Sequence, residues 1–349
     1  MRRAVPYFLQ QDTIRREDVM TETTKNPAVM EPTALERASA VPAETRARIE
    51  ALKAERDAVI LAHYYVEPEV QAVADYVGDS FYLAKLAKSL PQQTIVLCGV
   101  EFMGESAKLL NRTKTVLLPE PAADCPMAHM VQRATIDAAR AEYGDDLAVV
   151  CYVNSTMKIK SWSDVCVTSS NAVKIVRELP QSHVLFIPDR NLGRFVAEQV
   201  PEKHVILNDG CCPRHEAISL AELQELKREH PEALVLAHPE CTAAVLAEAD
   251  YIGSTAGIIA YAEQSAAQEF IVVTVQGVLY ELERRCAASG KRFFVTRTPP
   301  TCGDMDGITL EKLVRCLETG SGAVEIGVDE AAAQRAQATL DRMLEYAAR

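Results

Sequence analysis

The amino-acid sequence predicts an α/β fold in which three similar Rossmann-like α/β units surround a pseudo-threefold axis with a central cavity. Two observations lead to this prediction. Short β-branched runs alternate with amphipathic stretches from about residue 58 to about residue 298, an order of elements typical of α/β proteins. The same polar landmarks also recur three times at nearly constant intervals. A chain of 349 residues is long enough for two or three domains of about 150 residues.

The individual elements follow from local patterns. A helical pattern at 43–53 precedes the first strand-like run, AVILA at 58–62. Later runs, such as TIVL at 94–97 and VIL at 205–207, are apolar throughout, as in parallel strands that are covered on both faces. The last stretch, 329–349, has the pattern of an amphipathic helix, and we expect it to pack against the body of the protein.

The repeat is defined by three kinds of residue. Three strand-like runs end at a polar aromatic or imidazole side chain, namely His63, Tyr152 and His238. In each case a hydroxyl residue follows 17 positions later, namely Ser80, Ser169 and Thr255. A cysteine then follows 62, 60 or 64 positions after the strand-end residue, namely Cys125, Cys212 and Cys302. Such regular spacing indicates three related units of about 85–90 residues, an ordinary size for a small domain.

These landmarks divide the chain. We expect a poorly ordered N-terminal extension at 1–42, where hydrophobic periodicity is weak. The three α/β units are predicted at 43–126, 127–213 and 214–302, and helices that pack back on the body at 303–349. Because ligands of open α/β sheets bind beyond the carboxyl ends of the strands, the landmark side chains are predicted to meet in one cavity.

Charge and composition exclude several functions. The chain has 37 Lys and Arg against 49 Asp and Glu, a formal net charge of −12, which argues against a general binder of nucleic acids or anionic membranes. No apolar run approaches the roughly 20 residues that span a bilayer. The first dozen residues turn polar too early for a signal peptide. We therefore expect a cytoplasmic protein that holds any anionic ligand at a local site.

The ten cysteines fall into different groups. Five lie in apolar runs or helical patterns, where cysteine behaves as a small hydrophobic residue; these are Cys98, Cys151, Cys166, Cys286 and Cys316. Cys125, Cys212 and Cys302 instead follow strand-like runs among Pro, Gly, Asp and Thr. Three thiolates with an open fourth position suit a cubane iron–sulfur cluster with one free iron. Zinc is the alternative, although the chain lacks the Cys-x-x-Cys pairs common in zinc sites.

The remaining landmarks suggest anion binding and proton transfer. Hydroxyls at helix N-termini can hold carboxylates or phosphates, although each could equally be only an N-cap. Glu240 lies two residues after His238 and is a candidate acid–base neighbour. Three further candidates, Tyr65, Tyr152 and Asn154, could form hydrogen bonds with a ligand. His215 follows Cys212 by three positions and either contacts that cysteine or marks the start of a helix.

Several motifs, in order along the chain, resemble the quinolinate synthase family. They are LAHYY at 61–65, GDS at 78–80, GVEFMGESAK at 99–108, YVNS at 152–155, PDRNLG at 188–193, HPE at 238–240 and GST at 253–255. The resemblance runs from about residue 52 to the C-terminal helix. It implies a pseudo-threefold assembly of three α/β domains around a 4Fe–4S cluster, held by the same three cysteines that the intervals select, Cys125, Cys212 and Cys302.

The resemblance also implies a reaction. The family condenses iminoaspartate with dihydroxyacetone phosphate to give quinolinate, phosphate and water in NAD biosynthesis, and L-aspartate oxidase is the expected source of iminoaspartate. The free iron is expected to act as a Lewis acid. By resemblance, the substrate-binding residues are His63, Ser80, Tyr152, Asn154, Ser169, His238, Glu240 and Thr255. Tyr65, His238 and Glu240 are the expected proton carriers.

The chain departs from the family pattern at three places. Cys302 has no Cys-x-x-Cys neighbour, so we expect no redox-switching disulfide there. Val275 occupies a turn where the family usually has an acidic residue. About 45 residues at the N-terminus match nothing in the family. The competing hypothesis is a non-catalytic iron–sulfur redox or iron sensor, which would not need three anion-binding turns or the His238–Glu240 pair.

Overall fold

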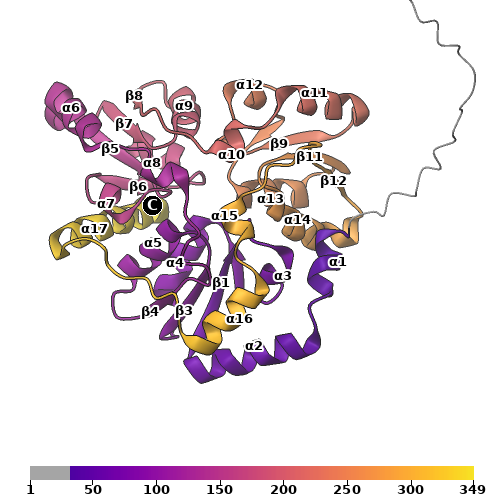
Figure 1. The fold of residues 1–349 in the computed structure, drawn as a ribbon. Coiled ribbons are helices and arrows are strands. Elements are labelled where there is room, and N and C mark those ends of the chain that lie inside the picture. Colours follow the sequence, from indigo (N-terminus) through magenta and orange to yellow (C-terminus); the bar gives the residue numbers. More distant parts are fainter. Residues whose placement is uncertain (1–31) are drawn as a thin grey trace, which may run out of the picture. The chain divides into compact units, whose positions relative to one another are not determined.

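The computed structural model describes residues 32–349 and confirms the predicted α/β class (Figure 1). Residues 1–31 of the expected N-terminal extension lie outside this range. Residues 34–39, which the sequence analysis placed in that extension, instead form helix α1 (Ala34–Ser39). A capping box explains this helix, because the side chains of Thr33 and Glu36 each accept a hydrogen bond from the other residue's backbone N–H.

Three parallel four-stranded sheets form the framework, and all three have the same strand order. The first sheet has the order β2-β1-β3-β4 and consists of β1 (Ala58–His63), β2 (Tyr76–Gly78), β3 (Thr94–Cys98) and β4 (Thr115–Leu117). The second, β6-β5-β7-β8, consists of β5 (Leu147–Tyr152), β6 (Val165–Val167), β7 (His183–Ile187) and β8 (His204–Leu207). The third, β10-β9-β11-β12, consists of β9 (Leu234–Ala237), β10 (Tyr251–Ile252), β11 (Glu269–Val273) and β12 (Arg292–Phe294).

The helices repeat with the sheets. Around the first sheet they are α2 (Ala43–Arg56), α3 (Pro68–Gln71), α4 (Ser80–Ser89), α5 (Glu101–Leu110) and the 3-10 helix η1 (Pro126–His129). Around the second they are α6 (Arg133–Tyr143), η2 (Gly144–Asp146), α7 (Met157–Lys160), α8 (Ala172–Glu178), α9 (Arg190–Gln199) and α10 (Pro213–Glu216). Around the third they are α11 (Leu220–Glu229), α12 (Ala243–Leu246), α13 (Thr255–Gln264), η3 (Gln276–Val278), α14 (Leu279–Cys286), η4 (Ala287–Ser289) and α15 (Gly303–Asp306).

Both faces of the third sheet are buried, as its apolar runs predict. Leu236 and Phe270 belong to one hydrophobic cluster, which also contains Ile258 of α13. Val235 and Ile271 belong to another, on the side of α11 and α12. Neighbouring residues of one strand point to opposite faces, so a strand that is covered on both faces is apolar at consecutive positions.

Two C-terminal helices cover the first two sheets. α16 (Leu310–Thr319) packs against α2, and α17 (Glu330–Ala348) packs against β6, α7 and α5. The side chains of Ala333, Ala336, Leu340 and Met343 are fully buried and recur at the three- to four-residue spacing of one helix face. In Figure 1, α17 lies beside the second sheet. No helix among residues 32–349 is both long and apolar enough to cross a membrane.

Gly322 is expected to be a sensitive position in the C-terminal segment. Its φ is +86°, and its carbonyl accepts a hydrogen bond of 2.8 Å from the N–H of Leu118 at the end of β4. A Cβ at this position would overlap the carbonyl oxygen of Leu118. We therefore expect Gly322→Ala to lower the free energy of unfolding by about 2–4 kcal/mol, measured by urea denaturation under anaerobic conditions.

Gly290→Ala is the matched control. Gly290 has a similar φ of +66°, but a Cβ there would meet no atom within 4 Å. We expect it to cost only about 1 kcal/mol, the penalty of the left-handed backbone. Equal losses in the two variants would mean that the close approach to Leu118 does not matter.

Candidate active site

The carboxyl ends of the three sheets enclose a cavity, as expected for a ligand site of α/β sheets. In Figure 1, the short helices α10 and α15 lie in the middle of the molecule, between the three sheets. All twelve residues that the sequence singled out line this cavity. They are His63, Tyr65, Ser80, Cys125, Tyr152, Asn154, Ser169, Cys212, His238, Glu240, Thr255 and Cys302. Their chemical roles remain predictions.

The three cysteines occupy equivalent positions. Cys125, Cys212 and Cys302 are the N-cap residues of the one-turn helices η1, α10 and α15. Backbone N–H groups of the turn that follows act to lower the pKa of each thiol. Burial nevertheless raises the pKa of each thiol, that of Cys125 to about 12. Buried thiols close to backbone N–H groups are suited to bind a soft metal as thiolates.

The three sulfurs of the described chain are not all close enough together to be ligands of one zinc ion. Four tetrahedral ligands of one zinc ion lie about 3.8 Å apart, given Zn–S bonds of about 2.3 Å. In the part of the chain that the structure describes, the three cysteines are not among the groups whose ligand atoms all lie within 4.8 Å of one another. A cubane cluster binds each sulfur to a different iron and so suits more widely spaced thiols.

Two closer groups could bind a single metal ion. One is Cys212, His215 and Glu240, and the other is Glu101, Asp124 and His129. The first group lies in the cavity wall and competes with the cluster for Cys212. The second has exposed Glu101 and His129 side chains, and exposed acidic groups often occur without a metal.

The hydroxyl residues are not simple N-caps. Asp79 and Ser254 cap α4 and α13, so Ser80 and Thr255 are the first helical residues. Ser169 lies three residues before the start of α8, whose N-cap is Asn171. The Thr255 hydroxyl bonds the Tyr65 hydroxyl at 2.8 Å, and the Ser169 hydroxyl lies 3.2 Å from Nε2 of His238. The alternative that these hydroxyls only cap helices is therefore wrong.

His63 and His238 have matching environments at the ends of β1 and β9. Nδ1 of His63 accepts a hydrogen bond from the N–H of Tyr65 at 3.2 Å, and Nδ1 of His238 accepts one from the N–H of Glu240 at 3.3 Å. Burial lowers the pKa of His63 to about 4 and that of His238 to about 3. Both rings are therefore neutral near pH 7, and each carries its proton on Nε2, available as a donor.

Glu240 is a buried carboxylate with several partners. Its Oε2 lies 2.8 Å from Nδ1 of His215 and 3.8 Å from Nδ1 of His238. Burial alone would raise the pKa of Glu240, but interactions with His215 and His238 and hydrogen bonds from His215 and Tyr152 outweigh it and hold the pKa below its usual value. Glu240 is therefore ionised and able to accept a proton from a bound ligand.

A chain of hydrogen bonds connects Tyr65 to Glu240. The Tyr65 hydroxyl bonds Oγ1 of Thr274 at 2.7 Å, and this oxygen lies 2.9 Å from Nε2 of His215. Nδ1 of the same imidazole faces Glu240 and lies 3.3 Å from Sγ of Cys212. Burial raises the pKa of Tyr65 well above its usual value, so the phenol stays protonated and acts as a donor.

Sequence reasoning missed two members of the site and left one open. Thr274 was not identified, because only the fold brings it to Tyr65, 209 positions away. Asp189 was not identified as a contact of the cysteine loop, although its Oδ2 accepts the N–H of Cys212 at 3.0 Å. His215 was left open, and the structure shows that it contacts Cys212. Val275 lies in the cavity wall, where its aliphatic side chain adds no charge.

These features together define an enzyme-type α/β protein, with a cavity that combines ionisable groups and three cysteine thiols. A family model described as quinolinate synthetase A protein matches residues 47–345. The chain therefore belongs to the quinolinate synthase family of enzymes.

Individual relatives agree with this assignment. The chain is 48% identical over 300 residues to the quinolinate synthase of Fusobacterium nucleatum, covering 86% of this chain and 98% of the relative. It is 45% identical over 297 residues to that of Caldicellulosiruptor saccharolyticus, covering 85% and 96%. It is 45% identical over 271 residues to that of Clostridioides difficile, covering 78% and 88%.

Proposed function

We propose that this chain condenses iminoaspartate with dihydroxyacetone phosphate to form quinolinate, phosphate and water. The observation that carries the proposal is the single cavity at the ends of three sheets, which brings together one N-capping cysteine from each sheet and the nine other residues selected by sequence. Family membership supports the same reaction.

Cys125, Cys212 and Cys302 would hold a 4Fe–4S cluster in this proposal. The equivalent N-cap positions and the burial of the thiols support this assignment. When bound, such a cluster supplies a Lewis-acidic iron that can polarise an oxygen of the substrate.

Residues of all three units would bind the anionic groups of the substrates. Ser80 and Thr255 begin the ten-residue helices α4 and α13, whose unpaired N–H groups and positive dipole ends favour carboxylate and phosphate oxygens. The Nε2–H groups of His63 and His238 add two neutral donors. Tyr152, Asn154 and Ser169 add further hydrogen-bonding groups to the wall.

Proton transfer would depend on Glu240, His238 and Tyr65. The ionised Glu240 carboxylate can remove a proton from carbon or nitrogen of a bound intermediate, and neutral His238 beside it can donate a hydrogen bond from Nε2–H to an oxygen that gains negative charge. The protonated Tyr65 phenol can donate to a departing hydroxyl. Thr274 and His215 join Tyr65 and Glu240 through hydrogen bonds, so the donor and the acceptor are held in one network.

The setting of the reaction follows from its chemistry. Iminoaspartate is the product of an amino-acid oxidation, so we propose supply by L-aspartate oxidase. An iron–sulfur cluster with an exposed iron requires a reducing compartment, which supports a cytoplasmic location.

The test is quinolinate formation by the full chain, purified and assayed under anaerobic conditions. We expect a brown, iron-containing protein that makes quinolinate only when both substrates are present, and loses this activity when iron is chelated. Omission of each substrate is the control. A colourless, zinc-containing protein that is equally active would contradict the cluster, and a brown protein that never forms quinolinate would favour the sensor hypothesis.

A further inference from the structure

The cavity wall contains one permanent positive charge. Of the described residues that line it, Arg214 is the single lysine or arginine. Arg214 belongs to α10, between Cys212 and His215. Both proposed substrates are anions, whereas the wall also contains the carboxyl groups of Asp79 and Glu240.

The guanidinium of Arg214 is only weakly engaged by the protein. Its Nη2 lies 3.8 Å from Oδ2 of Asp304, which is too long for a hydrogen bond. Within residues 32–349, its side chain makes no hydrogen bond. It is 41% exposed. An arginine has five N–H donors, so those of Arg214 are available to a ligand.

The neighbouring Arg190 differs from Arg214, because its guanidinium is hydrogen-bonded to another side chain. Arg190, at the start of α9, donates to Oε1 of Glu216 at 2.7 Å and also lies 3.5 Å from Asp209. Arg190 does not line the cavity. Arg214, which faces the cavity, is therefore less engaged by the protein than Arg190, which does not.

The position of Arg214 joins two cysteine loops. A Cβ built on Gly303 would lie 3.8 Å from Nη2 of Arg214, so the guanidinium reaches from the Cys212 loop to the start of α15, immediately after Cys302. Glycine at 303 leaves the guanidinium uncovered on this side. An anion bound here would lie next to two of the three cysteines.

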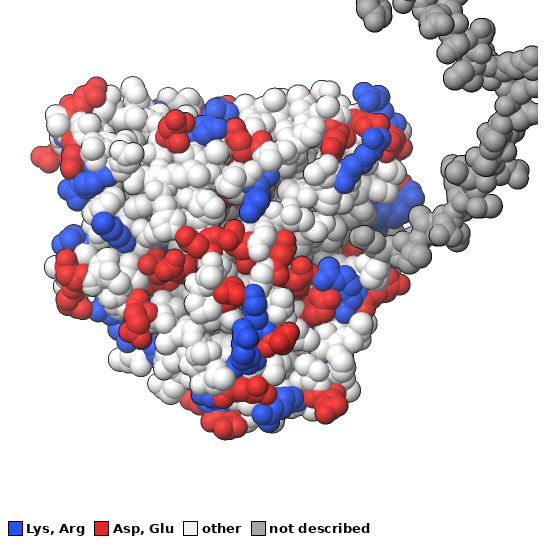
Figure 2. Space-filling view, in the orientation of Figure 1, with Lys and Arg blue, Asp and Glu red and all other residues white. Residues whose placement is uncertain are grey.

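Acidic side chains surround this region. Figure 2 shows a band of Asp and Glu across the middle of the visible face, and α15 lies in the middle of the same view in Figure 1. α15 itself contributes Asp304 and Asp306. A negative surface repels incoming anions, so an anionic substrate needs a cation at the cavity to offset this repulsion.

We propose that the Arg214 guanidinium binds an anionic oxygen group of a substrate, either a phosphoryl or a carboxylate group. When this group binds, it replaces Asp304 as the partner of the guanidinium. This inference rests on the proposed function for its substrate class. The planar fork of an arginine matches two oxygens of either group, and such charge-assisted pairs are stronger than neutral hydrogen bonds. Arg214 is thereby a specificity-determining residue of the cavity.

The test measures equilibrium binding to the cluster-loaded full chain by anaerobic calorimetry. Inorganic phosphate is the probe for the phosphoryl group, and succinate is the probe for a dicarboxylate. We expect Arg214→Gln to weaken binding of one probe roughly 10-fold or more, which identifies the group that Arg214 holds. Arg214→Lys keeps the charge but loses the fork, and should recover only part of the affinity.

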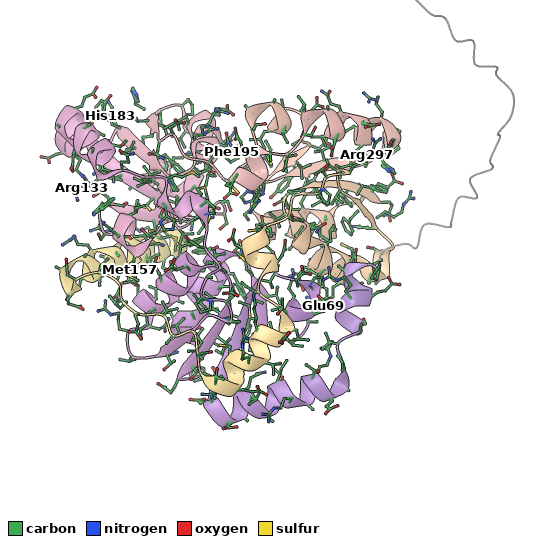
Figure 3. All side chains as sticks on the ribbon, viewed as in Figure 1. Glu69, Arg133, Met157, His183, Phe195 and Arg297 are labelled. Atoms are coloured by element: carbon green, nitrogen blue, oxygen red, sulfur yellow. The ribbon has the colours of Figure 1, made fainter. Side chains whose placement is uncertain are left out.

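Two further variants sharpen the result. Asp304→Asn removes the competing carboxylate and should tighten binding of the same probe a few-fold. Arg297→Gln is the matched control, because Arg297 is a 70% exposed arginine paired with Glu225, and Figure 3 labels it well away from the centre of the molecule. It should leave both affinities unchanged.

Unchanged binding of both probes in Arg214→Gln overturns the proposal, and so does a wild-type chain that binds neither probe. If Arg214→Gln loses iron, the Asp304→Asn variant provides the test instead. Binding of the probe to Asp304→Asn that is unchanged or weaker than binding to the wild-type chain contradicts the proposal. These binding measurements do not depend on whether the chain forms quinolinate. A chain that makes no quinolinate but binds phosphate through Arg214 would therefore disprove the proposed reaction and leave the anion site in place.

Discussion

Cys125→Ala, Cys212→Ala and Cys302→Ala are each expected to abolish the iron–sulfur cluster and, with it, quinolinate formation. Each sulfur is the single thiol that its sheet contributes to the cavity wall, so no neighbouring cysteine can replace it. A cubane held by two thiolates leaves two irons exposed to solvent, and such clusters decompose. The measurement is iron and sulfide content per chain, with visible absorbance, after anaerobic reconstitution.

The chain offers controls at increasing distance from the site. Cys211 is adjacent to Cys212 but does not line the cavity, so Cys211→Ala should retain the cluster. Cys98 and Cys316, like the other three cysteines predicted to be structural, are buried in the protein core. Cys98→Ala and Cys316→Ala should also retain it, with at most a modest loss of stability.

The same variants separate the cluster from a single metal ion. A mononuclear site at Cys212, His215 and Glu240 would survive Cys125→Ala and Cys302→Ala. A cluster would survive neither. Full metal content in both of these variants would therefore overturn the assignment of Cys125 and Cys302, whatever Cys212→Ala does.

The repeat explains why so much of this site could be predicted. Each sheet has the same strand order, so a residue at a given place in one unit has counterparts in the other two. The 17-residue interval from His63 to Ser80 spans a strand end, a four-residue helix, an edge strand and the start of a longer helix. The same elements separate His238 from Thr255. Equal intervals in the sequence therefore correspond to equivalent positions in the three units of the structure.

The contacts between units could not be predicted in this way. Tyr65 reaches Thr274 of the third unit, and Thr274 reaches His215 of the second. No local pattern encodes such contacts, since they depend on how the three units pack. Gln71 is a similar case, because its buried side chain donates to the carbonyls of Tyr64 and Gly277 and so ties the Tyr65 loop to the third unit.

The starts of α4 and α8 show that N-cap propensity alone does not identify the residue at the N-cap. Ser is a favoured N-cap, and Ser80 and Ser169 were each compatible with that role. In the structure, Asp79 accepts the N–H of Tyr82, and Asn171 accepts the N–H of Thr168. Asp79 thus caps α4, whereas the Asn171 side chain accepts a backbone donor upstream of α8 rather than capping the helix, and neither helix uses the hydroxyl of Ser80 or Ser169 as its cap.

Glu240→Gln is expected to retain the fold and the cluster but to lower kcat by roughly 10²–10⁴-fold, the usual contribution of a general acid–base group. The substitution keeps the size of the side chain and removes its charge and its basicity. Because Glu240 is ionised and faces His215 and His238, it is placed to accept a proton within the cavity, and no second carboxylate contacts these histidines among the described residues.

The comparison of kcat with KM distinguishes catalysis from binding. If Glu240 transfers protons, Glu240→Gln lowers kcat and leaves the KM of both substrates within a few-fold. If it only holds a substrate, KM rises and kcat persists. Glu248→Gln is the matched control, because Glu248 pairs with Lys227 away from the cavity wall and should give wild-type rates.

Iron content and absorbance must be measured on the same samples, because Glu240 contacts His215, which in turn contacts Cys212. Removing the carboxylate also removes the negative charge that helps to raise the pKa of the Cys212 thiol. Thiolate formation is therefore easier in Glu240→Gln, and cluster loading should be equal to or better than wild type. A variant with full iron and wild-type kcat would exclude Glu240 from the mechanism and leave Tyr65 and His238 as the remaining proton carriers.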